Sequence, residues 1–305
     1  MKNKPLSIST FNERFPDDDT CLDHLMRTRY GERLTCFKCL RDSRYYRVKT
    51  RRAFECEHCG YQVYPTAGTP FEQTRTSLRD WFYVMFLFCA SRNGVAAKEV
   101  ERQLGVTYKT AWRMCRLIRI YMGQVDGDAP LGGSGSDKGV VEIDKAFIGG
   151  YDKRGADDKK VVLGMAERGG EVMTRVIPDR TSHHIKPVVT KYVREGSFVA
   201  TDEALAFKFL RDYGYTHGTV DHSKKEYVRG EVHTNTIEAF WANLKRGIKG
   251  TYVHVSAKHL QTYLHEFEYR HNLRRQPALM FELLVSAFSR VSLEPLPKGA
   301  GQSAA

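Results

Sequence analysis

Two Cys-X-X-Cys pairs constrain the fold of this chain more than any other feature of its sequence. Cys36 and Cys39 form the first pair, Cys56 and Cys59 form the second, and sixteen residues separate the pairs. Two such pairs supply four thiolates in the pattern of a closed, tetrahedral zinc site. The surrounding residues 31–66 offer little apolar core, so zinc binding would supply free energy for folding. The sequence therefore predicts a zinc ribbon over residues 31–66.

The other cysteines and the apolar runs bear on the compartment. Cys21, Cys89 and Cys115 are isolated, and we interpret them as small apolar residues rather than disulfide partners. Residues 1–19 are polar and lack the apolar core of a secretory signal. The most apolar run, Trp81–Ala90, has half the length of a membrane span. These features predict a cytoplasmic chain with no membrane partner.

The charge balance points to a polyanionic partner. Lys and Arg number 48 against 36 for Asp and Glu, which gives a net charge of +12 and a pI near 9.3. Such an excess favours nucleic acid over a membrane surface as the binding partner.

Residues 77–122 predict a helical DNA-binding domain. Two helical segments flank a glycine-containing turn, and the second segment begins after Thr107, a residue suited to cap it. On this second helix Lys109, Arg113 and Arg116 recur along one face, opposite an apolar face. We interpret the pair as a helix-turn-helix with a major-groove recognition helix. The alternative is an ordinary solvated basic face.

From residue 140 onward the pattern changes to short β-branched strands interspersed with helices, which predicts a mixed sheet with helices packed on it. The expected domains are a helical lead-in (1–30), the zinc ribbon (31–66), the helix-turn-helix domain (77–122), a Gly/Ser-rich linker (123–139), an α/β domain (140–292) and a disordered tail (293–305).

Three acidic residues stand out in the α/β domain. Asp144 interrupts an apolar strand, Asp202 ends another strand, and Glu238 lies in the first turn of an amphipathic helix. In a ribonuclease-H-like sheet the first two of these strands are neighbours, and the helix could bring Glu238 to them. Three carboxylates with open coordination positions suit Mg²⁺. The alternative for Glu238 is a capping box with Asn235 at the start of the helix.

The helix that carries Glu238 also presents groups suited to DNA. Lys245 lies two turns after the glutamate on the same face, with Trp241 between them and Arg246 beside it. A cation and an indole near a carboxylate could meet a phosphate and its metal ion. The alternatives are ordinary packing for the indole and simple solvation for the cations.

The acidic motifs carry a family resemblance. The segments VEIDKAFIGG, VATDEALAF and HTNTIEAFWANLKRGIKGTY, with the downstream HLQTYLHEFEYRHNLR, resemble the DDE transposases of bacterial insertion sequences. The likeness is to the branch in which a zinc ribbon precedes a ribonuclease-H-like, retroviral-integrase-like catalytic domain. It implies an α/β fold class: a ribonuclease-H-like mixed sheet flanked by helices, preceded by a zinc ribbon and a helix-turn-helix domain.

The resemblance also implies a chemistry. Asp144, Asp202 and Glu238 would hold two Mg²⁺ or Mn²⁺ ions, and Lys245 would contact transposon-end DNA. Asn235 is the alternative third ligand. The expected activity is phosphodiester cleavage at element ends and joining of the 3′-hydroxyl to target DNA.

The resemblance implies partners as well. They are double-stranded DNA, as terminal inverted repeats and target, and further copies of the chain in a synaptic complex. The expected location is the nucleoid of a bacterial cytoplasm. The alternative function is a DNA-binding regulator, or a domesticated transposase without catalysis.

Overall fold

The computed structural model describes residues 6–126, 129–133, 139–149, 159–202, 205–220, 228 and 232–290. The expected tail over 293–305 lies outside these residues. The chain divides into two compact units, which are described separately: unit 1 comprises Met1–Ala90 with Ala278–Ala305, and unit 2 comprises Ser91–Pro277. The predicted α/β class is confirmed, with a five-stranded mixed sheet and flanking helices.

Unit 1 joins a helical core to small antiparallel strands. Its helices are α1 (Ile8–Arg14), α2 (Asp18–Tyr30), α3 (Leu78–Ala90) and α9 (Pro277–Ser289, in unit 1 from Ala278). Stacked and edge-to-face aromatic rings join α1, α3 and α9, because α3 and α9 both present phenylalanines to Phe11 of α1. Phe11 of α1 stacks on Phe86 of α3 and meets Phe281 of α9 edge-on. This packing explains why α9, far from α1 in the sequence, belongs to the N-terminal unit.

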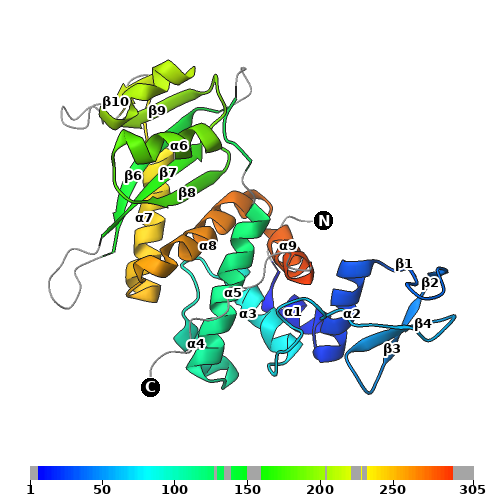
Figure 1. Ribbon diagram of the computed structural model, residues 1–305. Coiled ribbons are helices and arrows are strands. Elements are labelled where there is room, and N and C mark those ends of the chain that lie inside the picture. The colour runs from blue at the N-terminus through cyan, green and yellow to red at the C-terminus, as the bar shows by residue number, and fades with distance from the viewer. Residues whose placement is uncertain are drawn as a thin grey trace, which may run out of the picture. The chain divides into compact units, whose positions relative to one another are not determined.

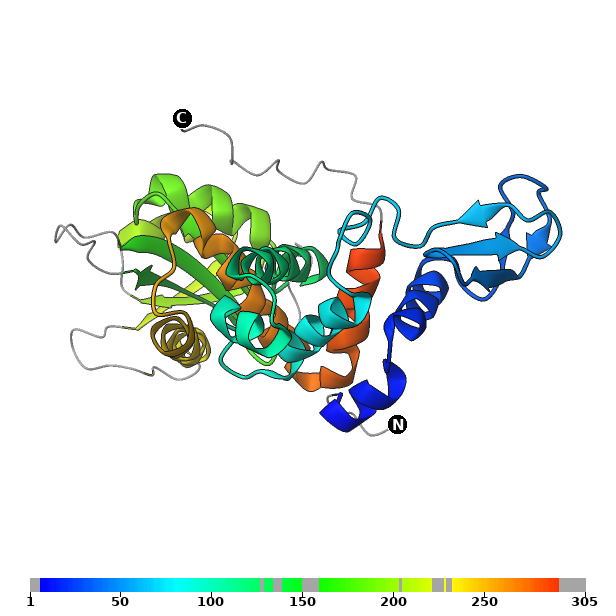
Figure 2. The same ribbon diagram turned by 90° about the horizontal axis from the view of Figure 1, so that it is seen from below.

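The ribbon strands follow α2. They are β1 (Leu34–Thr35), β2 (Asp42–Ser43), β3 (Tyr45–Val48), β4 (Ala53–Cys56) and β5 (Gln62–Val63). The strands pair antiparallel as a two-stranded sheet, β1-β2, and a three-stranded sheet, β3-β4-β5. In Figure 2 they lie next to α2. Acidic residues of α2 hold this arrangement, since Asp19 accepts a hydrogen bond from Arg47 and Asp18 accepts one from Arg52.

Unit 2 contains a five-stranded sheet, shown in Figure 1 with helices against it. The strands are β6 (Val141–Ile148), β7 (Lys160–Glu167), β8 (Val172–Ile177), β9 (Phe198–Asp202) and β10 (Thr216–Val220). Their order is β10-β9-β6-β7-β8. The first three strands in sequence pair antiparallel, while β9 and β10 join parallel to β6. The expectation that the first strand and the strand after the first helix are neighbours is confirmed.

The helices of unit 2 cover both faces of this sheet. They are α4 (Ala97–Leu104), α5 (Tyr108–Asp126), α6 (Ser182–Tyr192), η1 (Leu205–Tyr213), α7 (Asn235–Gly247), η3 (Ile248–Tyr252), η4 (Ala257–His259), α8 (Leu260–Asn272) and η5 (Leu273–Arg275). Helix α6 and the 3-10 helix η1 share one buried cluster with the sheet, and α7 and α8 share the other. The segment η1 takes the tighter 3-10 form.

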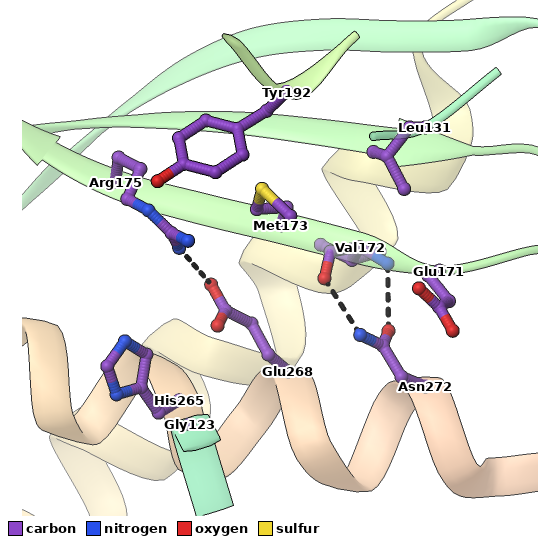
Figure 3. Close-up of a pocket in the computed structure, with 10 residues that line it drawn as sticks. All are labelled: Gly123, Leu131, Glu171, Val172, Met173, Arg175, Tyr192, His265, Glu268 and Asn272. Carbon is purple, nitrogen blue, oxygen red and sulfur yellow. Dashed lines mark hydrogen bonds and ion pairs between the residues drawn. The ribbon is translucent and has the colours of Figure 1, made fainter. Parts of the chain in front are cut away.

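Helix α8 also protects the exposed edge of the sheet. Strand β8 lies at the edge, where unpaired backbone groups would invite other strands. Asn272 accepts from the Val172 amide and donates to the Val172 carbonyl, as Figure 3 shows. Gln261 donates to the Thr174 carbonyl and accepts from the Val176 amide. The segment HLQTYLHEFEYRHNLR is therefore explained in part by edge protection.

The two compact units differ from the expected domain boundaries. Helix α3 belongs to unit 1, whereas α4 and α5 belong to unit 2. Helix α5 packs along α8, as both views show. The contact is close because Gly123 faces His265, whose ring would meet an added Cβ at 2.2 Å. A glycine expected to begin a flexible linker is instead a packing residue within α5.

The expected linker has a second structured part. Leu131 is buried in the core under the sheet and forms a parallel bridge with Val193. Its amide donates to the Tyr192 carbonyl at 2.8 Å. One leucine among the glycines therefore anchors this part of the Gly/Ser-rich segment to the core under the sheet.

No helix in the described ranges is long and apolar enough to cross a membrane.

Candidate functional site

The four ribbon cysteines converge as predicted. All four sulfur atoms lie within 4.8 Å of one another, with Cys36 and Cys59 at 3.6 Å and Cys39 and Cys56 at 3.9 Å. Four thiolates 2.3 Å from a zinc ion stand about 3.8 Å apart in a tetrahedron. The residues present therefore fit a structural Zn²⁺ in both chemistry and spacing.

The two cysteine turns repeat one backbone design. Cys36 accepts from the amide of Leu40 through its carbonyl, and Cys56 accepts in the same way from Gly60. The amides of Lys38 and His58 each approach the first sulfur of their turn at 3.4 Å. Desolvation acts to raise the pKa of Cys36, but backbone hydrogen bonds lower it to about 5. Hydrogen bonds lower the pKa of Cys56 as well, so the first cysteine of each turn favours the thiolate form that binds zinc.

Asp144 and Asp202 lie side by side where the parallel pairing of β6 and β9 ends, with Asp202 the last residue of β9 and Asp144 in the middle of β6. Strands β6 and β9 pair up to Ile143 and Thr201, and the two aspartates follow in the same register. Burial raises the pKa of Asp144, and the charge of Asp202 raises it further. Lys145 lies 3.7 Å from Asp202 and partly offsets this negative charge.

Glu238 lies on α7, the helix that contacts Asp144. The indole Nε1 of Trp241 donates to Asp144 at 3.1 Å, which fixes α7 against β6. Glu238 lies one helical turn before Trp241, where side chains are neighbours on the helix surface. Its carboxylate is exposed and accepts a hydrogen bond from the Thr234 hydroxyl at 2.7 Å.

The start of α7 differs from the expected capping box. The N-cap residue is Thr234, and Asn235 is the first residue of the helix and is exposed. Asn235 therefore does not cap α7. The two candidates for the third ligand are both on the surface, but only Glu238 is one turn from the residue that contacts Asp144.

The acidic residues suit divalent cations by their chemistry. In the described ranges the four cysteines are the only set of three or more His, Cys, Asp or Glu donors within 4.8 Å of one another. The carboxylates of Asp144, Asp202 and Glu238 are therefore not gathered to that distance. The charge of Asp202 acting on Asp144 is a repulsion that a bound cation would relieve. The donor set of hard oxygens fits Mg²⁺ or Mn²⁺.

Comparison with known proteins agrees with this geometry. The sequence-family model of an ISXO2-like transposase domain matches residues 137–272, and the family model of a transposase zinc-ribbon domain matches residues 16–62. The chain belongs to the insertion-sequence transposases. The first matched segment contains Asp144, Asp202 and Glu238, together called the acidic edge below, and the second contains the four cysteines.

Two relatives extend the comparison. An uncharacterized protein in transposable element ISH50 of Halobacterium salinarum is 28% identical over 278 residues, which cover 83% of this chain and 90% of the relative. An uncharacterized transposase-like protein of Haemophilus influenzae is 28% identical over 102 residues, covering 33% of this chain and 81% of that protein.

A glutamate that the sequence analysis overlooked holds the start of α7 in this transposase. Glu142 is fully buried on the same face of β6 as Asp144. It accepts hydrogen bonds from the backbone amides of Thr236 at 2.7 Å and Ile237 at 3.1 Å, and from the Thr236 hydroxyl at 3.0 Å. A carboxylate at a helix N-terminus satisfies its unpaired amides and complements its dipole.

The charge of Glu142 is balanced by Arg168, and the His233 ring lies beside it. Arg168 donates to it at 2.7 Å, and His233 Nδ1 lies 3.1 Å away. Two acids at alternate positions, Glu142 and Asp144, share one strand face, and this spacing is the signal that could have found the glutamate. Glu142 therefore supports the helix that carries Glu238.

Close approach of α7 to the sheet needs a residue without a side chain. Asp144 pairs with Gly164 of β7, where an added Cβ would meet the Trp241 ring at 2.3 Å. Trp241 itself is only 4% exposed. Its predicted DNA contact is therefore replaced by a different role, because the buried indole packs on Gly164 and orients Asp144.

The far end of α7 is tied to α5. Tyr252, in the π-helix η3 that continues α7, donates to the buried carboxylate of Glu266 in α8. Arg119 of α5 donates to the same carboxylate at 2.7 Å and lies over the Tyr263 ring. Burial acts to raise the pKa of Glu266, but Arg270 and Arg119 lower it to below its usual value. A buried glutamate therefore anchors each end of the α7–η3 segment: Glu142 at the start of α7 and Glu266 at Tyr252 of η3.

The basic residues predicted to contact DNA occupy different environments. Lys109 and Arg113 are exposed on α5, while Arg116 is half-buried with its guanidinium over the Trp112 ring. Thr107 accepts from the Thr110 amide, as expected of the residue before the helix. Lys245 and Arg246 are exposed at the C-terminal end of α7.

Proposed function

We propose that this transposase cleaves phosphodiester bonds at the ends of its element and joins the freed 3′-hydroxyl to target DNA. The observation that carries the proposal is the position of Asp144 beside Asp202 just beyond the paired part of β6 and β9, with Glu238 one turn from the residue that contacts Asp144. Carboxylates supplied by two adjacent strands and by the helix packed on one of them are suited to phosphoryl transfer.

Asp144, Asp202 and Glu238 would hold two Mg²⁺ or Mn²⁺ ions. Bound there, the ions supply an activated oxygen nucleophile and stabilise the departing oxygen. Neighbouring residues of the chain position these carboxylates. Trp241 orients Asp144 by its hydrogen bond, and the ammonium of Lys145 reduces the repulsion between Asp202 and Asp144. Lys245 is exposed on α7 two turns beyond Glu238, where an ammonium can bind a backbone phosphate of the element end.

Water is the nucleophile in the proposed cleavage, and the 3′-hydroxyl is the nucleophile in strand transfer. Hydrolysis breaks the bond between phosphorus and the 3′-oxygen, and strand transfer exchanges one phosphodiester for another. The terminal inverted repeats and target DNA would be held by the ribbon and the helix-turn-helix, in an assembly of several copies of the chain. A nucleoid location in a bacterial cytoplasm accompanies this function.

A conservative substitution tests the third ligand. Glu238→Gln keeps the size and the bond from Thr234 but removes the charged oxygen, so metal-dependent cleavage should fall about a hundredfold or more. The assay is Mg²⁺-dependent nicking of a duplex that carries the DNA flanking the gene. Thermal unfolding and DNA binding should stay near wild type.

Asn235→Ala is the matched control on the same helix turn. Because Asn235 is exposed and does not cap α7, this variant should keep its activity and stability. An active Glu238→Gln variant beside an inactive Asn235→Ala variant would transfer the role to Asn235. Specific binding without any cleavage by the wild-type chain would favour the regulator.

The salt dependence of DNA binding tests the basic face of α5. Lys109→Ala and Arg113→Ala should each lower the slope of log K against log salt by about 0.9, since each removes one phosphate contact. Arg116→Ala should affect folding stability more than the slope, because its guanidinium packs over Trp112. Lys208→Ala, an exposed lysine on η1, is the control. Equal slopes for all variants would show that the face of α5 is only solvated.

A further inference from the structure

A cleft of about 410 Å³ opens where the C-terminal end of α7 meets the end of β6. Its apolar lining includes Phe147 and Ile248 with Val253 and Val255 from the segment after η3. Phe147 is 49% exposed and Val253 is 80% exposed. Large apolar side chains gathered in an open concave site mark a binding surface rather than ordinary surface variation.

The polar part of the cleft has one sign of charge. Lys245, Lys249 and His254 line it, and the described lining residues include no carboxylate. An apolar wall with an aromatic ring, edged by cations, complements a ligand with a flat apolar part and attached anions. An unstacked base with its flanking phosphates is such a ligand.

The position of the cleft relates it to the acidic residues. Phe147 lies three residues beyond Asp144 on β6, which is about 10 Å along an extended strand. Lys245 lies seven residues beyond Glu238 on α7, which is also about 10 Å along a helix. Strand and helix therefore both run from the acids to the cleft, over a distance of about three stacked base steps.

The backbone at the cleft is held in an unfavourable form. Helix α7 continues as the π-helix η3, and Val253 follows it at a φ of 61°. A β-branched residue in this region is strained, and both π-turns and such strain concentrate at functional sites. Tyr252, anchored on buried Glu266, holds the turn so that the neighbouring Val253 side chain stands exposed.

We propose that this cleft binds an unstacked base of the DNA strand near the scissile phosphate, with Lys245 and Lys249 on the adjoining phosphates. The identity of that strand rests on the proposed transposase function. Stacking on Phe147 and contact with Val253 bind any base, so the cleft recognises an unpaired nucleotide rather than a sequence.

Equilibrium binding without divalent cations tests the cleft apart from cleavage. The probes are a fluorescent twelve-residue oligothymidine and a strand of equal length whose central four nucleotides are abasic, compared by anisotropy. The wild-type chain should bind the strand with bases about tenfold more tightly, the range expected for stacking of one base. Phe147→Ala and Val253→Asp should reduce this ratio to less than twofold. Lys249→Ala should weaken the binding of both probes equally.

Leu279→Asp, the same kind of change at an exposed leucine of α9, is the control and should leave the ratio unchanged. A tenfold ratio that persists in Phe147→Ala and Val253→Asp would overturn the proposal, even if the wild type cleaves element ends. If those variants lose the ratio while no variant or wild type cleaves DNA, the cleft binds bases and the proposed function fails. If Phe147→Ala or Val253→Asp changes the sedimentation of the protein in the absence of DNA, the cleft binds a second copy of the chain and the proposal is overturned.

Discussion

The cysteine site and the acidic edge of this transposase are assembled in opposite ways. The four cysteines lie within one short segment, and two turns with the same backbone hydrogen bonds bring them together. The three carboxylates come from two strands and a helix that are far apart in the sequence. The ribbon site is therefore local, while the acidic edge depends on the packing of unit 2.

This difference changes what supports each site. Around the cysteines, the positions of the sulfurs follow from the turns and from amide contacts such as Lys38 N to Cys36. At the acidic edge, position depends on buried groups that are not ligands: Glu142 at one end of α7, Glu266 beyond the other, and Gly164 beneath it. A local site is lost by changing a ligand, whereas a distributed site is also lost by changing its supports.

The largest effect should come from a zinc ligand. Cys36→Ser should abolish tight zinc binding, whose free energy in small structural sites is about 10–16 kcal/mol, and unfold the ribbon. Elemental analysis and far-ultraviolet circular dichroism would measure the loss. Cys89→Ser, a cysteine outside the cluster, is the control and should retain one zinc per chain. Zinc at full occupancy in Cys36→Ser would contradict the assignment.

An intermediate effect should come from a support of the acidic edge. Glu142→Gln removes the charge that Arg168 and the start of α7 share, and disruption of a buried ion pair costs about 3 kcal/mol. Unfolding free energy and DNA cleavage should both fall, while zinc content stays at one per chain. Glu171→Gln, an exposed glutamate in the β7–β8 turn, should change neither. Loss of zinc from Glu142→Gln would contradict the separation of the two sites.

The same contrast decides what the sequence could predict. The ribbon and its four ligands followed from spacing alone, because the determinants lie within the motif. The strands of unit 2 followed from short β-branched, apolar runs, and the neighbouring positions of Asp144 and Asp202 from the expected sheet order. Residue types and periodicity carry this information directly.

The remaining features depend on pairs of residues distant in the sequence. Glu142 was passed over because its partners, the amides of α7 and Arg168, lie far along the chain. Gly123 resembled a linker glycine, since nothing nearby shows that His265 of α8 will pack on it. Trp241 resembled a DNA contact because its burial on Gly164 is a property of the sheet. Each was missed because its role is set by tertiary contact.

The smallest effect should distinguish the two cysteine turns from each other. Each turn ends in a left-handed residue, Gly60 at a φ of 68° and Leu40 at a φ of 58°. Leucine in this region is strained by about 1–2 kcal/mol, partly offset in a glycine variant by the greater freedom of the unfolded chain. Leu40 is 78% exposed, so removing its side chain forfeits little burial. Leu40→Gly should therefore stabilise the site by about 0.5–1 kcal/mol, and Gly60→Leu should destabilise it by about 1 kcal/mol.

Competition with a chelator would detect the first change as zinc binding about threefold tighter. Weaker zinc binding by Leu40→Gly would mean that the leucine side chain supports the turn, and that the two turns are alike in backbone only.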